Sequence, residues 1–259
     1  MDSMGQKIPL VSIITVCYNN LEGLKRTYES IKEQTFCLWE WVVIDGGSND
    51  GTIEYLNSID SDKVKFKSEN DNGIYDAMNK GALFASGVYL NFLNSGDTYT
   101  DEKTLSITFK VPVSDIIYGN FILIKMNMDK KVITPVGFNF NGLKYYGTGA
   151  VNHQAFFVRK KYFLPYNLRY QLKGEYDWYL RIFNKYNPST CHINRPIVNY
   201  YEGGASSLRF LRNIFEYLII ITKRYGITHI YNRRNFIFRY LKFHLSVFFQ
   251  KHFRTTRQK

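Results

Sequence analysis

With 259 residues, the chain is long enough for one large domain with a buried core. Hydrophobic residues make up 45% and charged residues 22%, which excludes a disordered or low-complexity protein. Most of the net charge of +12 lies at the C-terminal end, because the segment from Arg209 to Lys259 holds twelve Lys or Arg residues and one acidic residue. A nearly neutral body followed by a basic appendage is therefore expected.

Apolar and helical segments alternate over the first hundred residues. The expected strands are 10–16, 39–45, 63–67 and 88–93, and the expected helices are 22–34, 52–59 and 74–85. Such alternation is typical of βαβ units and of a parallel sheet covered by helices on both faces. Ligands of these sheets bind where loops leave the carboxyl ends of the strands. Asp45 and Asp97 both lie at such strand ends.

The pattern changes from residue 114 onward. Segments 115–125 and 131–136 predict a hairpin or meander, and the chain then continues to a strand, a helix and a last strand, expected at 154–158, 175–186 and 193–200. A mixed α+β second half on a parallel first half is the coarse architecture. Beyond it, segments 208–221 and 236–249 predict basic amphipathic helices, in the first of which Leu211, Phe215, Leu218 and Ile219 form an apolar stripe.

The three cysteines and the N-terminal apolar run bear on the compartment. Cys17, Cys37 and Cys191 have no CxxC spacing, so neither a zinc site nor a disulfide framework is indicated, and a reducing cytoplasm is the simplest interpretation. The apolar run Leu10–Cys17 is interrupted by polar residues and preceded by a single Lys, which favours a buried strand over a signal peptide. No stretch reaches the length of about 18 uncharged apolar residues that is typical of a membrane span.

The glycine-rich loop Gly46–Thr52 does not match the common nucleotide-binding motifs. It has the glycine spacing of a P-loop but no Lys before Thr52, and the chain contains no G-x-G-x-x-G. Taken alone, this loop is best explained as a tight turn that caps the following helix.

Three motifs in order carry more information than any one alone. They are PLVSIITVCYNN, then WVVIDGGSNDGT, then NDNGIYDAMNKGALFASGVYLNFLNSGD. This succession resembles the N-terminal half of family-2 glycosyltransferases, in particular the branch that assembles bacterial exopolysaccharide, capsule and O-antigen. The resemblance is continuous from Pro9 to about Asp101 and looser to about Ser207. It implies the GT-A fold, a Rossmann-like α/β fold with a mixed, mostly parallel sheet flanked by helices.

The resemblance also implies how the chain is organised and what it does. Residues 1–112 would form the nucleotide-sugar half of the GT-A domain, 113–207 the acceptor half, and 208–259 the basic aromatic appendage. The implied reaction is transfer of a sugar, with inversion, from a UDP- or GDP-sugar to a saccharide or polyprenyl-linked acceptor.

Several donor contacts are implied residue by residue. Asp45 would contact the nucleobase or ribose, and the turn around Tyr18 would form the other wall of that pocket. Asn79, on the same helix as Asp76, would lie near the donor. For Asp76 and Asn79 a role on the helix surface and in capping is an equal alternative.

The segment Asn94-Ser95-Gly96-Asp97 occupies the place of the family's D-x-D motif. Asp97 would bind Mg²⁺ or Mn²⁺ with a full carboxylate, and Asn94 would add a neutral oxygen. These hard cations take oxygen ligands, so the diphosphate and water would supply the rest. A plain strand-to-helix turn is the alternative for this segment.

The acceptor hydroxyl needs a base, and two acidic residues at one helix start could supply it. The resemblance places Glu175 in the base position, where the family normally has Asp, and Asp177 is the substitute. As alternatives, Glu175 could stabilise the helix N-terminus and Asp177 could pair with Arg181 four residues later. His153 could contact metal or phosphate, but a structural role is the more common one for a lone His.

The basic appendage and the remaining alternatives complete the expectations. Basic and aromatic residues in 208–259 suit an anionic membrane surface, so we expect a cytoplasmic protein held on the inner face of the plasma membrane. Nucleic acid is not an expected partner, because no binding motif accompanies the charge. The loop around Gly203-Gly204 could be a lid or an ordinary connector. A catalytically inactive scaffold at the membrane and, less favoured, a nucleotidyltransferase are the competing functions.

Overall fold

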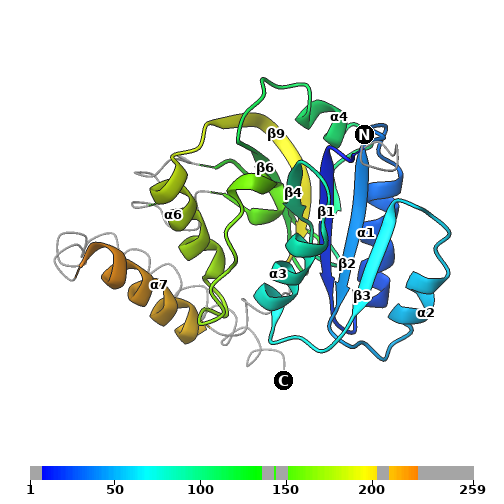
Figure 1. Cartoon of the computed structure of the whole chain (residues 1–259), viewed down its shortest axis with the longest axis horizontal. Helices are drawn as coiled ribbons and strands as arrows, with labels where there is room; N and C mark the ends of the chain where they lie inside the picture. The colour runs from blue at the N-terminus through cyan, green and yellow to red at the C-terminus, as the bar shows by residue number, and fades with distance from the viewer. Residues whose placement is uncertain (1–7, 136–142, 144–150, 203–209, 227–259) are drawn as a thin grey trace. The chain divides into compact units, whose positions relative to one another are not determined.

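The computed structural model describes residues 8–135, 143, 151–202 and 210–226. The chain divides into two compact units, residues 1–202 and 203–259. The first unit contains the sheet and, of the described helices, all but α7, which is Phe210–Tyr225 (Figure 1).

The first half of this unit is a parallel sheet of order β3-β2-β1-β4. Its strands and helices are β1 (Val11–Cys17), α1 (Leu21–Lys32), β2 (Trp39–Asp45), α2 (Thr52–Asn57), β3 (Val64–Ser68), α3 (Ile74–Phe84) and β4 (Tyr89–Phe92). Cys17 lies opposite Asp45 and Asp45 opposite Ser68, so the strands end in register. Their carboxyl ends form the edge at which β3 passes to α3, at the lower end of the sheet in Figure 1.

The second half continues the same sheet in a mixed pattern. Beyond β4 the order is β8-β6-β9-β5, in which β6 and β9 are parallel and the other neighbours antiparallel. The elements are β5 (Thr98–Tyr99), α4 (Thr104–Thr108), β6 (Ile116–Ile124), β7 (Lys130–Ile133, paired with β6), β8 (Phe156–Arg159), α6 (Gly174–Tyr186) and β9 (Thr190–Tyr201). Two 3₁₀ turns, His153–Ala155 and Lys160–Tyr162, flank β8.

The sheet curls back on itself at β5. The hydroxyl of Tyr99, in β5, donates to Oδ1 of Asn91, in β4, over 2.8 Å. In a flat sheet β4 and β5 would be four strand spacings, about 19 Å, apart. A tyrosine side chain cannot span that distance, so the curl brings the carboxyl ends of β4 and β9 together.

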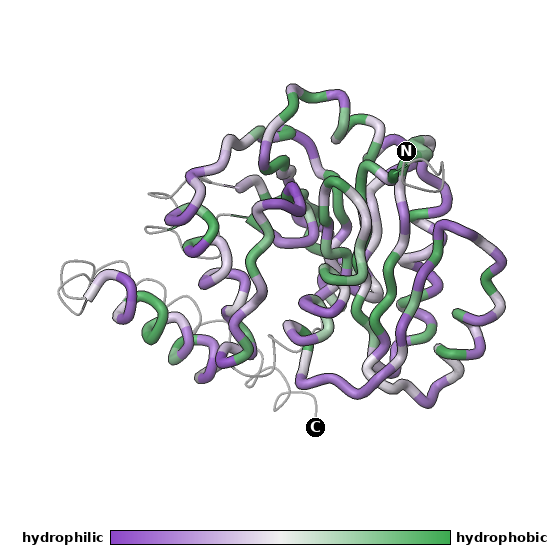
Figure 2. The backbone as a smooth tube through the Cα atoms, in the orientation of Figure 1, coloured by the Kyte–Doolittle hydropathy of each residue, from purple (hydrophilic) through white to green (hydrophobic). Residues whose placement is uncertain are grey.

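The core lies against this sheet. Figure 2 shows hydrophobic segments along the central strands and mostly hydrophilic ones in the outer connections. α1 turns Leu24, Tyr28 and Ile31 inward at helical spacing, and the Tyr28 ring stacks on that of Trp41 with centroids 4.6 Å apart. The indole of Trp41 donates to the hydroxyl of Thr15, which in turn donates to the carbonyl of Leu93.

A buried carboxylate joins three strands at the opposite edge from the β3–α3 connection. Glu40, at the start of β2, is 3% exposed and accepts hydrogen bonds from the hydroxyl of Ser12 and from Ser86 and Gly87. The ammonium of Lys65 lies 2.8 Å from its other oxygen. Burial alone would raise the pKa of Glu40, but Lys65 and the donated hydrogen bonds outweigh it and lower the pKa.

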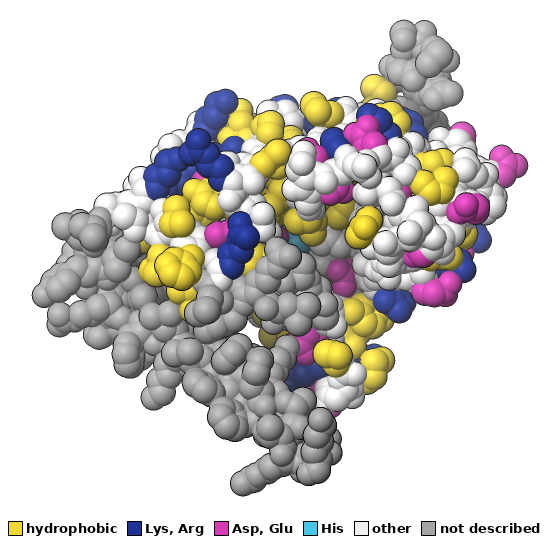
Figure 3. Space-filling view, turned by 90° about the horizontal axis from the view of Figure 1, so that it is seen from below, with side chains coloured by type: hydrophobic (Ala, Val, Ile, Leu, Met, Phe, Trp, Pro, Cys, Tyr) yellow, Lys and Arg dark blue, Asp and Glu magenta, His cyan; other side chains and the backbone are white. Residues whose placement is uncertain are grey.

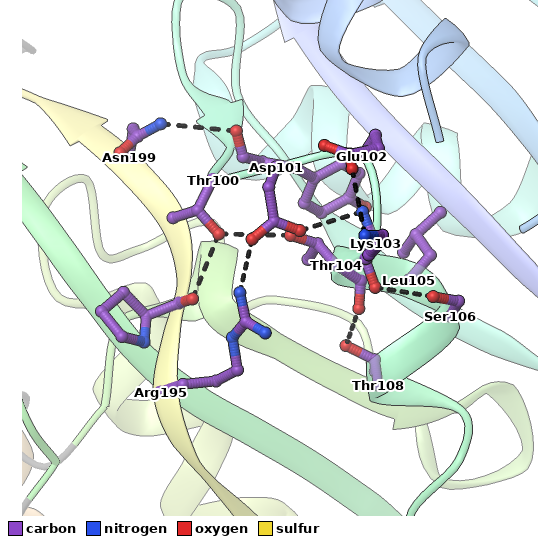
Figure 4. Close-up of polar contacts among 12 residues, drawn as sticks. Thr100, Asp101, Glu102, Lys103, Thr104, Leu105, Ser106, Thr108, Arg195 and Asn199 are labelled. Atoms are coloured by element: carbon purple, nitrogen blue, oxygen red, sulfur yellow. Dashed lines mark hydrogen bonds and ion pairs between the residues drawn. The ribbon is translucent and has the colours of Figure 1, made fainter. Parts of the chain in front are cut away.

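A second polar junction anchors the segment after β5 (Figure 4). Asp101 pairs with the guanidinium of Arg195 from β9 and accepts from the backbone N–H of Lys103. The hydroxyl of Thr100 donates to the carbonyl of Pro196 and lies 3.2 Å from that of Thr104. These contacts fix the start of α4 against β9.

The expected elements of the first half agree with the structure to within two residues at most ends. β5 and α4 were not expected, because two and five residues are too few to show a period. The strand expected from residue 154 begins at Phe156, since Asn152 accepts a hydrogen bond from the backbone N–H of Gln154 and closes a 3₁₀ turn there. The helix expected at 236–249 and the loop at Gly203-Gly204 lie outside the described residues.

In the second unit, the described part is the helix α7, Phe210–Tyr225. Tyr217, Ile220 and Ile221 are buried, whereas Phe215 and Ile219 are exposed. Among the residues with described coordinates, no helix combines the length and apolarity needed to cross a bilayer.

Candidate functional site

Two loops join at the carboxyl ends of β1 and β2. Asn19 adopts a left-handed φ of 47°, which lets its backbone N–H donate to the hydroxyl of Ser48 over 2.7 Å. Its side-chain oxygen accepts from the backbone of Asn49, and Asp50 accepts from the backbone of Leu21. The loop that follows β1 and the loop that follows β2 are therefore hydrogen-bonded to each other and cover the ends of both strands.

Asp45 is buried beneath these two loops and binds one of them. The residue is 0% exposed, and its carboxylate accepts from the backbone of Gly47 and Ser48 and from the hydroxyls of Ser48 and Ser68. The predicted contact of Asp45 with the nucleobase or ribose stays a prediction. In the structure, the hydrogen bonds of Asp45 fix the conformation of the Gly46–Asn49 turn.

Another carboxylate lies beside this turn where it is open to solvent. A Cβ added to Gly46 would meet Oδ2 of Asp71 at 2.7 Å and the ring of Tyr18 at 3.3 Å. Tyr18 is 66% exposed, and the other oxygen of Asp71 accepts from the backbone of Gly73. Tyr18 and Asp71 therefore face the same small space above a glycine without a side chain.

The first turns of α3 use Asp76 and Asn79 internally. Asp76 accepts from the backbone of Asn72 and pairs with Lys80, and these contacts lower its pKa, the Asn72 hydrogen bond contributing most. The amide of Asn79 donates to the carbonyl of Tyr166 and accepts from its N–H. Asp76 thus makes a contact of the capping kind named above as its alternative, whereas Asn79 binds a distant segment of backbone. The place of both residues near a donor stays a prediction.

The turn Asn94–Asp97 is clamped by α1. Gly96 has a φ of +105°, which only glycine adopts readily, and its N–H and carbonyl bind Thr27 and Arg26. The amide of Asn20 donates to the carbonyl and hydroxyl of Ser95. This turn is therefore a defined loop between β4 and β5.

Asp97 points inward from this turn. It is 6% exposed, and its carboxylate accepts from the backbone N–H of Tyr201, at the end of β9, over 2.7 Å. Burial raises the pKa of Asp97 to about 7, against the lowering effect of Tyr201, Gln154 and Arg26. A buried carboxylate with so little compensating positive charge is a good partner for a cation.

Asn94 faces the segment before β8. Its backbone N–H donates to Gln154, and its side-chain nitrogen lies 3.2 Å from Nε2 of His153. Its side-chain oxygen is buried and has no hydrogen-bond partner within the described part of the chain.

Glu175, in the first turn of α6, contacts the same histidine as Asn94. The hydroxyl of Tyr75 donates to its Oε2, and Nδ1 of His153 lies 3.3 Å from its Oε1. The Glu175 side chain keeps 18% of its surface exposed. Burial lowers the pKa of His153, and this effect is larger than the opposing effect of the nearby Glu175 carboxylate. Burial and Glu175 together raise the pKa of Tyr75 well above its ordinary value.

Asp177 forms an ion pair within its own helix. Its carboxylate pairs with Arg181 one helical turn later over 2.6 Å, and its side chain is 7% exposed. Arg181 also donates to the carbonyl of Pro165. Of the two base candidates, Glu175 contacts His153, which in turn contacts Asn94.

Whether these residues could hold a divalent cation depends on their oxygen atoms. In the parts of the chain that are described, no three His, Cys, Asp or Glu side chains come together as a metal site. Asp97 and the oxygen of Asn94, which has no partner among the described residues, do offer two hard ligands on one short turn. This set fits Mg²⁺ or Mn²⁺ that takes most of its ligands from a diphosphate and water.

Four contributors were not singled out from the sequence: Asp71, Tyr75, Gln154 and Arg26. The first two lie in the NDNGIYDAMNKG motif, which was the available signal. Gln154 follows His153 directly in the part of the chain where the resemblance is looser, but its contact with the Asn94–Asp97 turn spans 60 residues. Arg26 had no signal, because its contact joins α1 to the same turn, 70 residues away in sequence. Figure 3 views the molecule from below, and acidic side chains and a histidine lie in that face.

Comparison with known proteins agrees with this arrangement. Residues 12–165 match the sequence model described as Glycosyl transferase family 2. The "PGL/p-HBAD biosynthesis glycosyltransferase" of Mycobacterium bovis (strain BCG / Pasteur 1173P2) is 29% identical over 85% of this chain and 87% of its own length. An Escherichia coli enzyme, "UDP-Glc:alpha-D-GlcNAc-diphosphoundecaprenol beta-1,3-glucosyltransferase WfgD", is 29% identical over 70% of this chain and 72% of its own.

Solved structures show the same fold. S. aureus TarS in complex with UDP superposes with a TM-score of 0.62 at 14% identity, covering 87% of this chain and 73% of that one. The mannosyltransferase PcManGT from Pyrobaculum calidifontis, in complex with GDP-Man and Mn²⁺, gives 0.58 at 16% identity over 84% and 64%. The expected GT-A fold is thereby confirmed. With its matching motifs, sheet order and family model, the chain belongs to glycosyl transferase family 2, and it is a glycosyltransferase.

Proposed function

We propose that the chain transfers a sugar from a nucleoside-diphosphate donor to a saccharide or polyprenyl-linked acceptor in surface polysaccharide assembly, with inversion at the anomeric carbon. The observation that carries this proposal is the convergence of Glu175, His153 and Asn94 at the carboxyl edge of the sheet. It places a partly exposed carboxylate beside the turn proposed to hold the diphosphate.

The nucleoside end of the donor binds at the joined loops. Tyr18 offers an exposed ring for stacking, and Asp71 offers a carboxylate oxygen that can accept from a base N–H. Asp45 contributes from beneath, because its four hydrogen bonds hold the turn on which the nucleoside rests.

At the diphosphate, Asp97 and Asn94 would hold Mg²⁺ or Mn²⁺. When bound, such an ion neutralises charge on the departing nucleoside diphosphate. The comparison with the GDP-Man and Mn²⁺ complex of PcManGT supports this choice of cofactor.

Glu175 serves as the base. As the acceptor oxygen forms its bond to the anomeric carbon and the bond to the nucleoside diphosphate breaks, the hydroxyl proton passes to the Glu175 carboxylate. Tyr75 and His153 keep that carboxylate in place, and its exposed fraction gives the acceptor access.

The basic appendage would hold the enzyme on an anionic membrane surface at the inner face of the plasma membrane. Its described helix, α7, leaves Phe215 and Ile219 exposed four residues apart, on the same helical face. Basic residues with such apolar ones suit an interfacial helix. Removing residues 209–259 is expected to abolish co-sedimentation with phosphatidylglycerol vesicles, and unchanged binding would refute this part.

The test of the central proposal is a donor panel. The purified chain is incubated with Mn²⁺, UDP- or GDP-sugars and either free saccharides or saccharide-diphosphate-polyprenols, and both nucleotide release and glycosylated product are measured. We expect product from one donor class, and anomeric NMR signals that show inversion. Binding of UDP or GDP without hydrolysis or transfer from any donor would instead identify an inactive nucleotide-binding scaffold, the one competing function that the single carboxylate of the Asn94–Asp97 turn favours.

A further inference from the structure

Both oxygens of the Glu175 carboxylate are held by side chains from other parts of the fold. Tyr75 comes from α3 and donates to Oε2, and His153 comes from the 3₁₀ turn before β8 and faces Oε1 at 3.3 Å. Neither residue is near Glu175 in sequence. A carboxylate that only capped its own helix would need neither contact.

The neighbours of His153 define its protonation pattern. Nδ1 faces a carboxylate, which accepts hydrogen bonds and cannot donate when ionised, so Nδ1 carries a proton. A neutral imidazole with hydrogen on Nδ1 has an unprotonated Nε2, which can accept from the side-chain nitrogen of Asn94, 3.2 Å away. The neutral imidazole with hydrogen on Nδ1 satisfies both neighbours.

The orientation of the Asn94 amide is coupled to this tautomer. Because the amide nitrogen of Asn94 is turned toward His153, its oxygen is left over, and that oxygen is buried without a partner among the described residues. With the other imidazole tautomer, Nε2 would donate, and the amide would have to turn its oxygen toward His153 instead.

We propose that His153 is a positioning residue with two separable tasks: it holds Glu175 through Nδ1, and through Nε2 it orients Asn94 so that the amide oxygen faces the cation. This inference rests on the proposed function. It assigns to His153 a link between the base and the cation-binding turn rather than a direct contact with metal or phosphate.

The surroundings keep this link rigid. A Cβ on Gly174 would meet the Tyr75 ring at 2.6 Å, so the missing side chain is what lets Tyr75 reach Glu175. The Tyr75 ring stacks on that of Tyr166 with centroids 5.1 Å apart, and Asn79 binds the backbone of Tyr166 through both amide atoms. Asn79 therefore supports the base through two packed rings.

The two tasks can be separated with amide side chains. His153→Asn places an amide nitrogen near the position of Nδ1, so it keeps the donor to Glu175 and loses the contact to Asn94. His153→Gln reaches the position of Nε2, so it keeps an acceptor for Asn94 and loses the contact to Glu175. His153→Ala loses both. His192→Ala is the matched control, since His192 in β9 contacts Asn120 and lies outside this group.

Two readouts follow these tasks. We expect kcat to fall about 10- to 100-fold in His153→Ala and His153→Gln but to stay within about fivefold of wild type in His153→Asn, with the KM for the donor little changed. Mn²⁺ affinity in the presence of UDP, measured by electron paramagnetic resonance of free Mn²⁺, is expected to weaken in His153→Ala and His153→Asn but not in His153→Gln. His192→Ala should match wild type in both.

The opposite outcomes would overturn the proposal. If His153→Asn is as slow as His153→Ala, or if His153→Gln keeps the wild-type kcat, His153 does not hold the base. If Mn²⁺ affinity falls equally in all three variants, His153 binds the cation itself.

One measurement separates failure of this inference from failure of the proposed function. Nitrogen NMR of the ¹⁵N-histidine-labelled protein reports the tautomer without any turnover. Hydrogen on Nδ1 of His153 in the wild type, lost in Glu175→Ala, supports the link even if no donor is used. Hydrogen on Nε2 refutes it even if transfer is observed.

Discussion

The paired substitutions Glu175→Gln and Asp177→Asn are expected to have opposite signatures. Each replaces a carboxylate by the amide of the same shape in the first turn of α6. Glu175 faces His153 and Tyr75 and is partly exposed, whereas Asp177 is nearly buried and paired with Arg181. The first change should therefore affect turnover, and the second should affect stability.

The magnitudes follow from these contacts. Loss of a general base costs about 10²- to 10⁴-fold in kcat, or about 3 to 5 kcal/mol in the activation free energy. Asp177→Asn weakens a hydrogen bond between charged groups, which is worth about 1.5 to 3 kcal/mol when shielded from water. Because Arg181 is 25% exposed and keeps its bond to Pro165, we expect about 1 to 2 kcal/mol, or a Tm lower by about 2 to 8 °C.

Initial rates of nucleotide release at saturating donor measure the first effect, and thermal unfolding measures the second. Calorimetric binding of UDP provides the control, since neither change touches the joined loops of the nucleoside site. Wild-type turnover in Glu175→Gln, together with a hundredfold loss in a folded Asp177→Asn protein, would mean that the base is Asp177.

Three further predictions concern the cation site and the fold. Asp97→Asn keeps an acceptor for the backbone of Tyr201 but loses the charge, so transfer and Mn²⁺ affinity should both fall while Tm is kept; full activity would remove Asp97 from the cation site. Glu40→Gln should lower the Tm at neutral pH by losing about 2 to 4 kcal/mol of a buried charged network. The pKa of Glu40 is lowered in the folded state, so the ionised carboxylate stabilises the fold above about pH 4.5, and this stabilisation is lost as the pH falls through the folded-state pKa. The difference in Tm between the wild type and Glu40→Gln should therefore shrink below about pH 4. A difference in Tm that does not depend on pH would contradict this assignment. Gly87→Ala would place a Cβ 2.6 Å from the backbone nitrogen of Ser12, which cannot move aside. We expect the free energy of unfolding, measured by urea titration, to fall by about 1 to 3 kcal/mol. An unchanged urea midpoint would show that the turn at Gly87 can shift.

The first half of the fold and the family could be predicted from the sequence. The run WEWVVID is buried along its whole length, and its mostly apolar composition is typical of a strand covered on both faces, so its bounds could be predicted to the residue. The order of the motifs identified the family, and strand ends pointed to Asp45 and Asp97. The short elements β5 and α4 lacked a period and were found only in the structure.

The long-range contacts of the candidate site residues follow from the tertiary structure and not from any local sequence pattern. Asp45 ends its strand as predicted, but it is fully buried beneath the loop. Asp71, in the segment between β3 and α3, lies beside Gly46 on the open side. The choice between Glu175 and Asp177 depends on Tyr75, 100 residues earlier, and on His153. Local spacing can predict an i, i+4 pair such as Asp177 with Arg181, because one helix fixes both positions. Contacts between α3, α6 and the turn before β8 depend on how the sheet curls, and no local pattern in the sequence encodes that curvature.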